Sequence, residues 1–368
     1  MGRELTQDPS SRGLTEENII HIPGLLSRWV QLANGSRAHY VTSGETGPAV
    51  ILLHGSIEGS SGTAGWRFMA PFLGANGFRV FAPDRPGFGL SDVSRPEYLD
   101  QGPHAQVEFV KMFADALCID KFHLSGNSGG CAISTNFVVT YPERVLSVAF
   151  IAGGLGDIVT PEQRVNPTEG KFTPKPDYKR DPFDGSEKSM HDLMAGIIYE
   201  AQAIWPELVA MRTHAARLQR EARGLDLNKP MEAARIAGAR GQNANTEQIY
   251  TTKNRITKLT TPMIYMYGLQ DVLSPVENGF NQEDAAPNIQ FFYPNHCGHQ
   301  GQTDQPDMFN QVFLEFFRDG KVSAKTAEWA NVSRRRPINP DRVEGPLPEA
   351  DANWLNQFTR EAMAASKS

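Results

Sequence analysis

A serine lies in a glycine-rich segment where a buried strand is expected to end. Residues 126–130 read Gly-Asn-Ser-Gly-Gly, after the strand-like run 122–125 and before a stretch that can begin a helix. A serine at such a sharp strand-to-helix turn adopts a strained backbone, so small residues are needed two positions before it and two after it. Gly126 and Gly130 meet that need. The pattern predicts that Ser128 is the nucleophile of an enzyme.

A serine nucleophile needs a base, and the base needs a carboxylate that fixes its tautomer and stabilises its charged form. We expect both groups to follow strands, so that they lie at the same edge of a sheet as the serine. Asp271 follows the predicted strand 262–267, and His299 follows the predicted strand 290–293. We therefore predict Ser128, Asp271 and His299 as a catalytic triad, in that chain order.

Each predicted partner of the serine has a rival. His296 stands three residues before His299, but the glycine directly before His299 gives the flexible approach that a base requires. Asp157 also follows a predicted strand and is the alternative to Asp271. We favour His299 and Asp271 and keep the two rivals as alternatives.

An oxyanion must also be stabilised, and backbone N–H groups aimed at it contribute about two or three orders of magnitude in rate. The turn His54-Gly55-Ser56 follows the predicted strand 49–53, and the N–H of Ser56 can supply one donor. Gly129, directly after the nucleophile, can supply the second. The sequence therefore predicts an oxyanion hole formed by Ser56 and Gly129.

Short β-branched or aromatic runs alternate with helical patterns along most of the chain. This alternation predicts an α/β protein with a mostly parallel, doubly wound sheet that is covered on both faces. Apolar residues recur at helical spacing over 107–117 and again over 309–317. The predicted strands are residues 49–53, 79–82, 122–125, 147–151, 262–267 and 290–293.

The regular alternation is interrupted between residues 156 and 255. Residues 160–185 are rich in Pro, Lys and Asp and predict a loop or flap, whereas residues 189–223 have a helix-forming composition. We therefore predict an inserted helical cap. The predicted parts are an N-terminal extension (1–24), a core (25–155 and 256–320), the cap (156–255) and a C-terminal extension (321–368).

Composition restricts the partners. The 368 residues are 40% hydrophobic, enough to bury a large core, and the formal net charge of −6 opposes general affinity for nucleic acid or anionic membranes. Neither a leader-like segment nor an apolar run of about eighteen residues occurs, so we expect a cytoplasmic protein that acts on a small molecule. The sequence lacks paired-cysteine, His-x-x-x-His and G-x-G-x-x-G patterns, so no metal, nucleotide or other cofactor is predicted.

The loop 84–92, Asp-Arg-Pro-Gly-Phe-Gly-Leu-Ser-Asp, resembles the loop that α/β-hydrolases carry after the corresponding strand, and the resemblance extends over about residues 35–320. Haloalkane dehalogenases and epoxide hydrolases share this loop but have an aspartate in the place of Ser128. Within the serine branch the chain is similar to meta-cleavage product hydrolases, which cleave a carbon–carbon bond in ring-fission products of aromatic compounds. The matching stretches are Gly-Asn-Ser at 126–128, the cap segment 207–212, Cys-Gly-His at 297–299 and the closing helix 309–314.

This resemblance implies a mechanism and a set of substrate contacts. A dienol substrate becomes its keto form, Ser128 with His299 attacks the ketone, and the acyl-enzyme is then hydrolysed. Arg212 would bind the substrate carboxylate, because a guanidinium matches a carboxylate in a bidentate pair. The residues predicted around the substrate, a small hydrophobic molecule with a carbonyl, are Gly55, Asn127, Arg212, Trp66, Phe68 and Gln300.

The chain departs from this family near the expected substrate. Gln300 stands where a tryptophan usually follows the catalytic histidine, Phe68 stands where an asparagine is expected, and the loop after His54 differs from the family's glycine-rich loop. The cap is also longer. An ester or lactone hydrolase is therefore the main alternative, and a ligand-binding homologue with slow turnover is the second. A homodimer also stays open.

Overall fold

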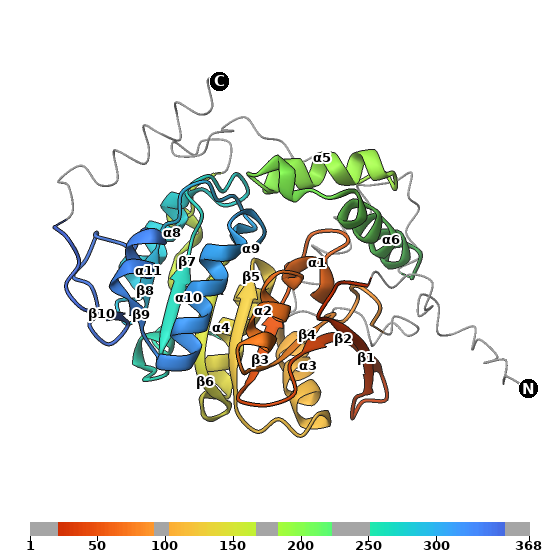
Figure 1. The fold of residues 1–368 in the computed structure, drawn as a ribbon, viewed down its shortest axis with the longest axis horizontal. Coiled ribbons are helices and arrows are strands. Elements are labelled where there is room, and N and C mark those ends of the chain that lie inside the picture. The colour runs from red at the N-terminus through yellow and green to blue at the C-terminus, as the bar shows by residue number, and fades with distance from the viewer. Residues whose placement is uncertain (1–20, 92–102, 167–182, 223–250, 350–368) are drawn as a thin grey trace, which may run out of the picture.

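The computed structural model describes residues 21–91, 103–166, 183–222 and 251–349 (Figure 1). Its centre is an eight-stranded sheet with the order β1-β2-β4-β3-β5-β6-β7-β8. β2 is antiparallel to β1 and β4, and all the other neighbours are parallel, which confirms the predicted α/β sheet. The strands are β1 (Leu26–Gln31), β2 (Arg37–Ser43), β3 (Ala49–Leu53), β4 (Arg79–Pro83), β5 (Phe122–Asn127), β6 (Val145–Ile151), β7 (Met263–Met266) and β8 (Gln290–Phe292).

Helices cover both faces of this sheet. The helices are α1 (Gly62–Trp66), α2 (Met69–Ala75), α3 (Pro103–Ala116), α4 (Gly129–Thr140), α5 (Glu187–Ile197), α6 (Pro206–Ala222), α8 (Val276–Ala285), α9 (Gly301–Asp304), α10 (Pro306–Asp319) and α11 (Ala324–Trp329). Successive side chains of a strand point to opposite faces. Along β3, Ile51 and Leu53 belong to the buried cluster of α3, α4 and α8, whereas Val50 and Leu52 belong to that of α2, α10 and α11. None of the helices in the described ranges is long and apolar enough to cross a bilayer.

Of these helices, α5 and α6 lie not on a face of the sheet but over the end of it where α1 and α9 are also found (Figure 1). Their apolar faces form a third buried cluster together with Ile57 and Ala64 of the core. Both helices belong to the predicted cap 156–255, of which residues 167–182 and 223–250 lie outside the described ranges. The division of the chain into core, cap and extensions stays a prediction.

The segment after α10 packs along the edge strand β8. The N–H of Tyr293 donates to Asn331 O and the N–H of Ser333 donates to Phe291 O, each at 2.9 Å, so this segment covers the edge of the sheet. It also contains α11 and the short parallel pair β9 (Val322–Ser323) and β10 (Val343–Glu344). Part of the predicted C-terminal extension therefore contributes buried apolar side chains to the α10 face, among them Val322, Ala327, Ala330, Val332 and Val343.

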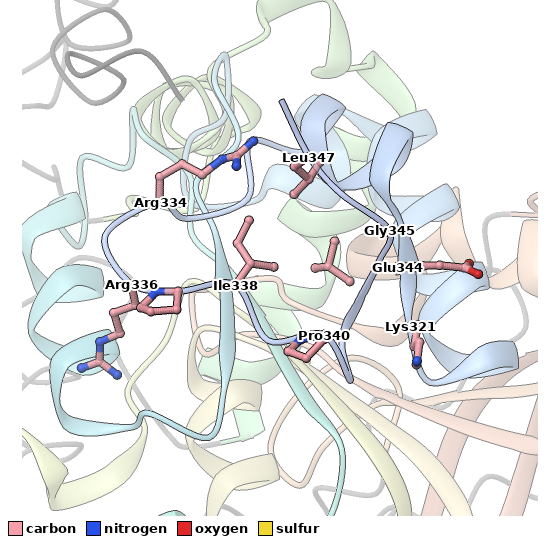
Figure 2. Close-up of a pocket in the computed structure, with 10 residues that line it drawn as sticks. Lys321, Arg334, Arg336, Ile338, Pro340, Glu344, Gly345 and Leu347 are labelled. Carbon is pink, nitrogen blue, oxygen red and sulfur yellow. The ribbon is translucent and has the colours of Figure 1, made fainter. Parts of the chain in front are cut away.

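A hollow of about 640 Å³ opens beside this segment (Figure 2). Ile338 lies in its middle, and Lys321 and Glu344 bring charges of both signs to its wall. The guanidinium of Arg336 turns away from the hollow and pairs with Asp284, Nη2 to Oδ1 3.5 Å. None of the predicted catalytic residues lines this hollow.

Candidate active site

Ser128 lies at the junction of β5 and α4. Its φ of 55° and ψ of −117° belong to a strained region that residues with a side chain rarely adopt. A side-chain carbon at Gly126 would lie 2.1 Å from Gly130 O, and one at Gly130 would lie 2.2 Å from Leu53 O. Only glycine fits at these two positions, so strand, turn and helix pack as closely as the sequence pattern requires.

His299 and Asp271 meet beside this turn. Their Nδ1 and Oδ2 atoms are 2.7 Å apart, and the Asp271 side chain is fully buried. Its other oxygen accepts the N–H groups of Leu273 and Ser274, each at 2.9 Å. A carboxylate held in this way fixes the imidazole tautomer with its proton on Nδ1, which leaves the lone pair on Nε2.

The backbone of His299 is held from two sides. Its N–H donates to Ile197 O at the end of α5, and its carbonyl accepts the Nδ2–H of Asn127, both at 2.9 Å. Nε2 is buried and has no hydrogen-bond partner in the described part of the chain, Ser128 included. Asn127 thus positions the histidine loop, and its predicted contact with substrate stays a prediction.

Gly55 and Ser56 lie beside the nucleophile. A side-chain carbon at Gly55 would lie 3.3 Å from Ser128 Cβ, and one at Gly129 would lie 2.0 Å from Ser56 Oγ. The structure therefore brings Ser56 and Gly129, the two predicted oxyanion donors, next to each other and next to Ser128.

Arg85 fixes the orientation of the turn that contains Gly55. Its Nη2 donates to Gly55 O at 2.6 Å and to Ser56 Oγ at 2.8 Å. His54 donates from Nδ1 to the same carbonyl at 2.8 Å and accepts the N–H of Arg85 at Nε2, 2.9 Å. The carbonyl and N–H of a planar trans peptide point in opposite directions, so holding Gly55 O also fixes the direction of the Ser56 N–H.

Two buried arginines make the surroundings of this turn electropositive. Burial, together with Arg85 and Arg212, lowers the pKa of His54 to about 3, although Asp84 acts in the opposite direction. His54 is therefore neutral and can both donate and accept, as its two hydrogen bonds require. A positive potential at this place favours a negatively charged ligand or intermediate.

Arg212 points inward from α6. It is only 1% exposed, and its Nη2 donates to Glu58 O at 3.1 Å. Arg217, five residues further along the helix, is exposed. The structure thus places Arg212 against the loop that follows Ser56, while its predicted contact with a substrate carboxylate stays a prediction.

The other predicted contacts lie at different depths. Trp66 is fully buried in the apolar cluster of the α10 face. Phe68 is half-buried and meets Trp205 edge to face, with ring centroids 5.1 Å apart, and the guanidinium of Arg67 lies 4.2 Å from the Phe68 ring. Gln300 is buried just before α9. Phe68 therefore contacts the segment between α5 and α6, whereas Trp66 belongs to the core.

The two rival residues have other partners. His296 is exposed, and its Nδ1 lies 4.0 Å from Glu200 Oε1. Asp157 accepts the N–H groups of Thr252 and Lys253, each at 2.7 Å. Within the described ranges, no group of three His, Cys, Asp or Glu side chains is placed so that it could hold a metal ion.

Sequence reasoning missed the role of Arg85. The signal for it is an arginine two residues after the end of β4, in the loop 84–92 that was singled out only for its resemblance to other proteins. An arginine at the end of a central strand lies near the other strand ends, so its guanidinium can reach the turn after β3.

Residues 48–306 match the model of a protein family described as alpha/beta hydrolase fold. The chain is 30% identical over 305 residues to the 2-hydroxy-6-oxononadienedioate/2-hydroxy-6-oxononatrienedioate hydrolase of Paraburkholderia phymatum, covering 82% of this chain and 98% of the relative. It is 30% identical over 292 residues to the 2-hydroxy-6-oxo-6-phenylhexa-2,4-dienoate hydrolase of Burkholderia cepacia, covering 77% and 92%. The solved structure of a mutant meta-cleavage product hydrolase from Pseudomonas fluorescens IP01 has a TM-score of 0.59 at 26% identity, covering 80% of this chain and 98% of the other.

Proposed function

Because the chain belongs to the α/β-hydrolase fold family, we propose that it is a serine hydrolase that cleaves a carbon–carbon bond next to a ketone in a ring-fission product of an aromatic compound. Ser128 is the nucleophile, His299 is the base, and Asp271 orients the base. The relatives from Paraburkholderia and Burkholderia are named as hydrolases of such dienoates, and the chain matches nearly their whole length.

The observation that carries this proposal is the pattern of hydrogen bonds around His299. Its Nδ1 is bound to Asp271 and its main chain is bound on both sides, while Nε2 has no partner in the described residues. The proposed triad requires that the Ser128 hydroxyl donate to Nε2. Hydrogen bonds between a nucleophile and its base often tighten only when substrate binds.

The proposed reaction begins with conversion of the dienol to its keto form, so that the departing carbon can leave as a stabilised enolate. Ser128 Oγ bonds to the ketone carbon while His299 takes the hydroxyl proton, and the N–H groups of Ser56 and Gly129 stabilise the oxyanion. When the carbon–carbon bond breaks, its electron pair passes to the enolate, which takes up the proton from His299. Water activated by His299 then hydrolyses the acyl-enzyme and releases a carboxylic acid.

The charge around the turn supports a carboxylate-bearing substrate. Arg85 and Arg212 both lower the pKa of His54, which burial already lowers most, so their positive charges act at the turn beside Ser128. Both guanidinium groups are buried, and charge interactions are stronger where water is excluded. The dienoate names of the two relatives indicate carboxylates of this kind.

Loss of the yellow dienolate chromophore tests the proposed substrate class. The wild-type chain is mixed with a phenyl-substituted dienoate and with a dienedioate, and in parallel with aryl esters and lactones. We expect the dienolate absorbance to disappear with formation of one carboxylic acid and one shorter dienoate. Turnover of lactones without turnover of either dienolate would establish the ester or lactone alternative instead.

Replacing Arg212 by alanine tests how the carboxylate is bound. Hydrogen bonds to charged groups contribute about 1.5–3 kcal/mol, so we expect kcat/KM for the dienoates to fall about 10- to 100-fold in Arg212→Ala, with little change for neutral aryl esters. The matched control is Arg220→Ala, which removes another buried arginine of α6 that lies 5.0 Å from the Phe183 ring. Equal losses on acidic and neutral substrates would contradict a role in carboxylate binding.

A further inference from the structure

Asp304 joins two segments that meet beside His299. Its Oδ1 accepts the N–H groups of Tyr199 and Glu200, at 2.7 and 2.9 Å, and its Oδ2 accepts the N–H of Gly298 at 2.8 Å. The residue is the last of α9 and is only 6% exposed. A single buried carboxylate is thus shared by the histidine loop and the segment that leaves α5.

This junction lies directly against the predicted base. Gly298 precedes His299, and the N–H of His299 itself donates to Ile197 O, at the end of α5. A side-chain carbon at Gly298 would lie 2.8 Å from Ile197 O and 3.4 Å from Asp304 Oδ2, so the two segments are in close contact. A shift of the segment 197–200 would therefore move the main chain that carries the imidazole.

We propose that Asp304 is a positioning residue for the hydrolase reaction: by tying Gly298 to the segment 197–200, it holds the His299 ring at the distance from Ser128 that proton transfer requires. Asp304 acts through His299 and touches no reacting atom. This inference rests on the proposed function, because it needs Ser128 and His299 to be the reacting pair.

The charge state of Asp304 gives the proposal a distinctive readout. Burial raises the pKa of Asp304 to about 7, with Glu200 acting in the same direction and the three N–H donors acting against it. The other groups that face it are Tyr199 and Cys297, whose pKa values are raised mainly by burial and also by Asp304, and His296 beside Glu200. A proton on Asp304 removes an acceptor, so the junction is intact above neutral pH and weakened below it.

The test compares the full-length wild type with Asp304→Asn and Glu315→Gln in burst kinetics with a p-nitrophenyl ester. Asparagine keeps the shape but replaces one acceptor oxygen by a donor, which opposes at least one of the three N–H groups. Glu315 is the matched control, because it is also a buried carboxylate that accepts a main-chain N–H, from Ser323 at 2.7 Å, but it lies on α10. We expect the acylation rate at pH 8 to fall about 10- to 100-fold in Asp304→Asn, with KM little changed and Glu315→Gln unaffected, since a misplacement of about 1 Å can cost about 100-fold.

The pH dependence separates positioning from general stabilisation. Lowering the pH from 8 to 6 should slow the wild type more than Asp304→Asn, because only the wild type can lose the Asp304 charge. The proposal is overturned if Asp304→Asn matches Glu315→Gln in both rate and pH profile. If Asp304→Asn does not fold, Gly298→Ala decides instead: its methyl group separates the same segments, so a wild-type acylation rate in that variant also overturns the proposal.

A Ser128→Ala chain is included to tell the two proposals apart. A burst in Ser128→Ala equal to that of the wild type contradicts the proposed function and removes the basis for the role of Asp304. A burst confined to chains that contain Ser128, with no effect of Asp304→Asn or Gly298→Ala, contradicts the role of Asp304 alone.

Discussion

In the part of the chain that the structure describes, His299 and His39 each bind a buried carboxylate through Nδ1. The Ser128 array is the proposed triad Ser128, His299 and Asp271, and the Ser27 array consists of Ser27, His39 and Asp84. The distance from Nδ1 to the carboxylate oxygen is 2.7 Å in both. In the Ser27 array, Nε2 is also hydrogen-bonded to the serine hydroxyl, at 2.6 Å. Judged by side-chain hydrogen bonds alone, the Ser27 array is the more complete triad.

The backbone around each serine separates the two arrays. Ser27 lies within β1, in register with Val41 of β2. Ser128 lies in a strained turn at the start of α4, with Gly129 and Ser56, the proposed oxyanion donors, beside it. A nucleophile must project from its backbone toward a substrate and needs donors for the oxyanion, and only the turn provides both.

The two carboxylates also differ in what they hold. Asp84 accepts the N–H of Gly62 at 2.6 Å and the N–H of Leu90 at 2.8 Å, so it joins the start of α1 to the loop after β4. Among the described residues, the second oxygen of Asp271 accepts N–H groups only from the turn that follows it. The Ser27 array therefore stabilises packing between elements, whereas in the Ser128 array Nε2 of His299 has no partner among the described residues.

Removing each serine should give the largest contrast. Ser128→Ala should lower kcat by about 10⁴-fold or more, because a triad acts as a unit and loses most of its rate with any one of its members. Ser27→Ala should leave kcat unchanged, because its hydroxyl only completes a structural hydrogen bond. Steady-state dienolate turnover measures both variants, and a similar loss in Ser27→Ala would remove the distinction between the arrays.

Replacing each carboxylate by its amide should separate rate from stability. Asp271→Asn should lower kcat by about 10⁴-fold while keeping the fold, because asparagine favours the wrong imidazole tautomer. Asp84→Asn should instead lower the free energy of unfolding by about 1–3 kcal/mol, because a buried donor loses its acceptor, and should leave kcat of the folded chain unchanged. Denaturant unfolding and kcat are measured on both variants. The comparison fails if Asp84→Asn loses activity without losing stability.

The central strands could be predicted from the sequence, β3 because it is uniformly apolar and β5 because its strand-like run directly precedes the Gly-Asn-Ser-Gly-Gly turn. The runs at 49–53 and 122–125 become β3 and β5, which are buried along their whole length, as parallel strands covered on both faces should be. β1 was not predicted, because it is an edge strand whose side chains are only partly buried or exposed and carry no continuous apolar signal. Residue order did not separate Asp271 from Asp157, because both lie between Ser128 and His299 in the chain, and only the structure pairs His299 with Asp271.

Contacts between side chains and main chain could not be predicted. Arg85 holds Gly55 O, Asn127 holds His299 O, and Asp304 holds the N–H of Gly298, and each contact depends on where a distant carbonyl or N–H points. Residue types alone do not reveal that direction. The same limit applies to Ser27, because its hydrogen bond depends on where the His39 ring of the neighbouring strand points.

The smallest expected contrast concerns acid stability. Burial raises the pKa of Asp84, but the opposing effects of His39, His54 and the N–H of Leu90 prevail, so its pKa lies below the usual value. A carboxyl group whose pKa is lowered by folding stabilises the protein fully above its unfolded pKa of about 3.9, and this stabilisation is lost as the pH falls through its lower folded pKa. Below about pH 4, the free energy of unfolding should therefore fall with decreasing pH more steeply in the wild type than in Asp84→Asn. The difference between the two slopes is at most about 1.4 kcal/mol per pH unit, the value for one proton. Urea unfolding at a series of pH values from 6 to 3 measures both slopes. Equal slopes would show that protonation of Asp84 does not change the free energy of unfolding.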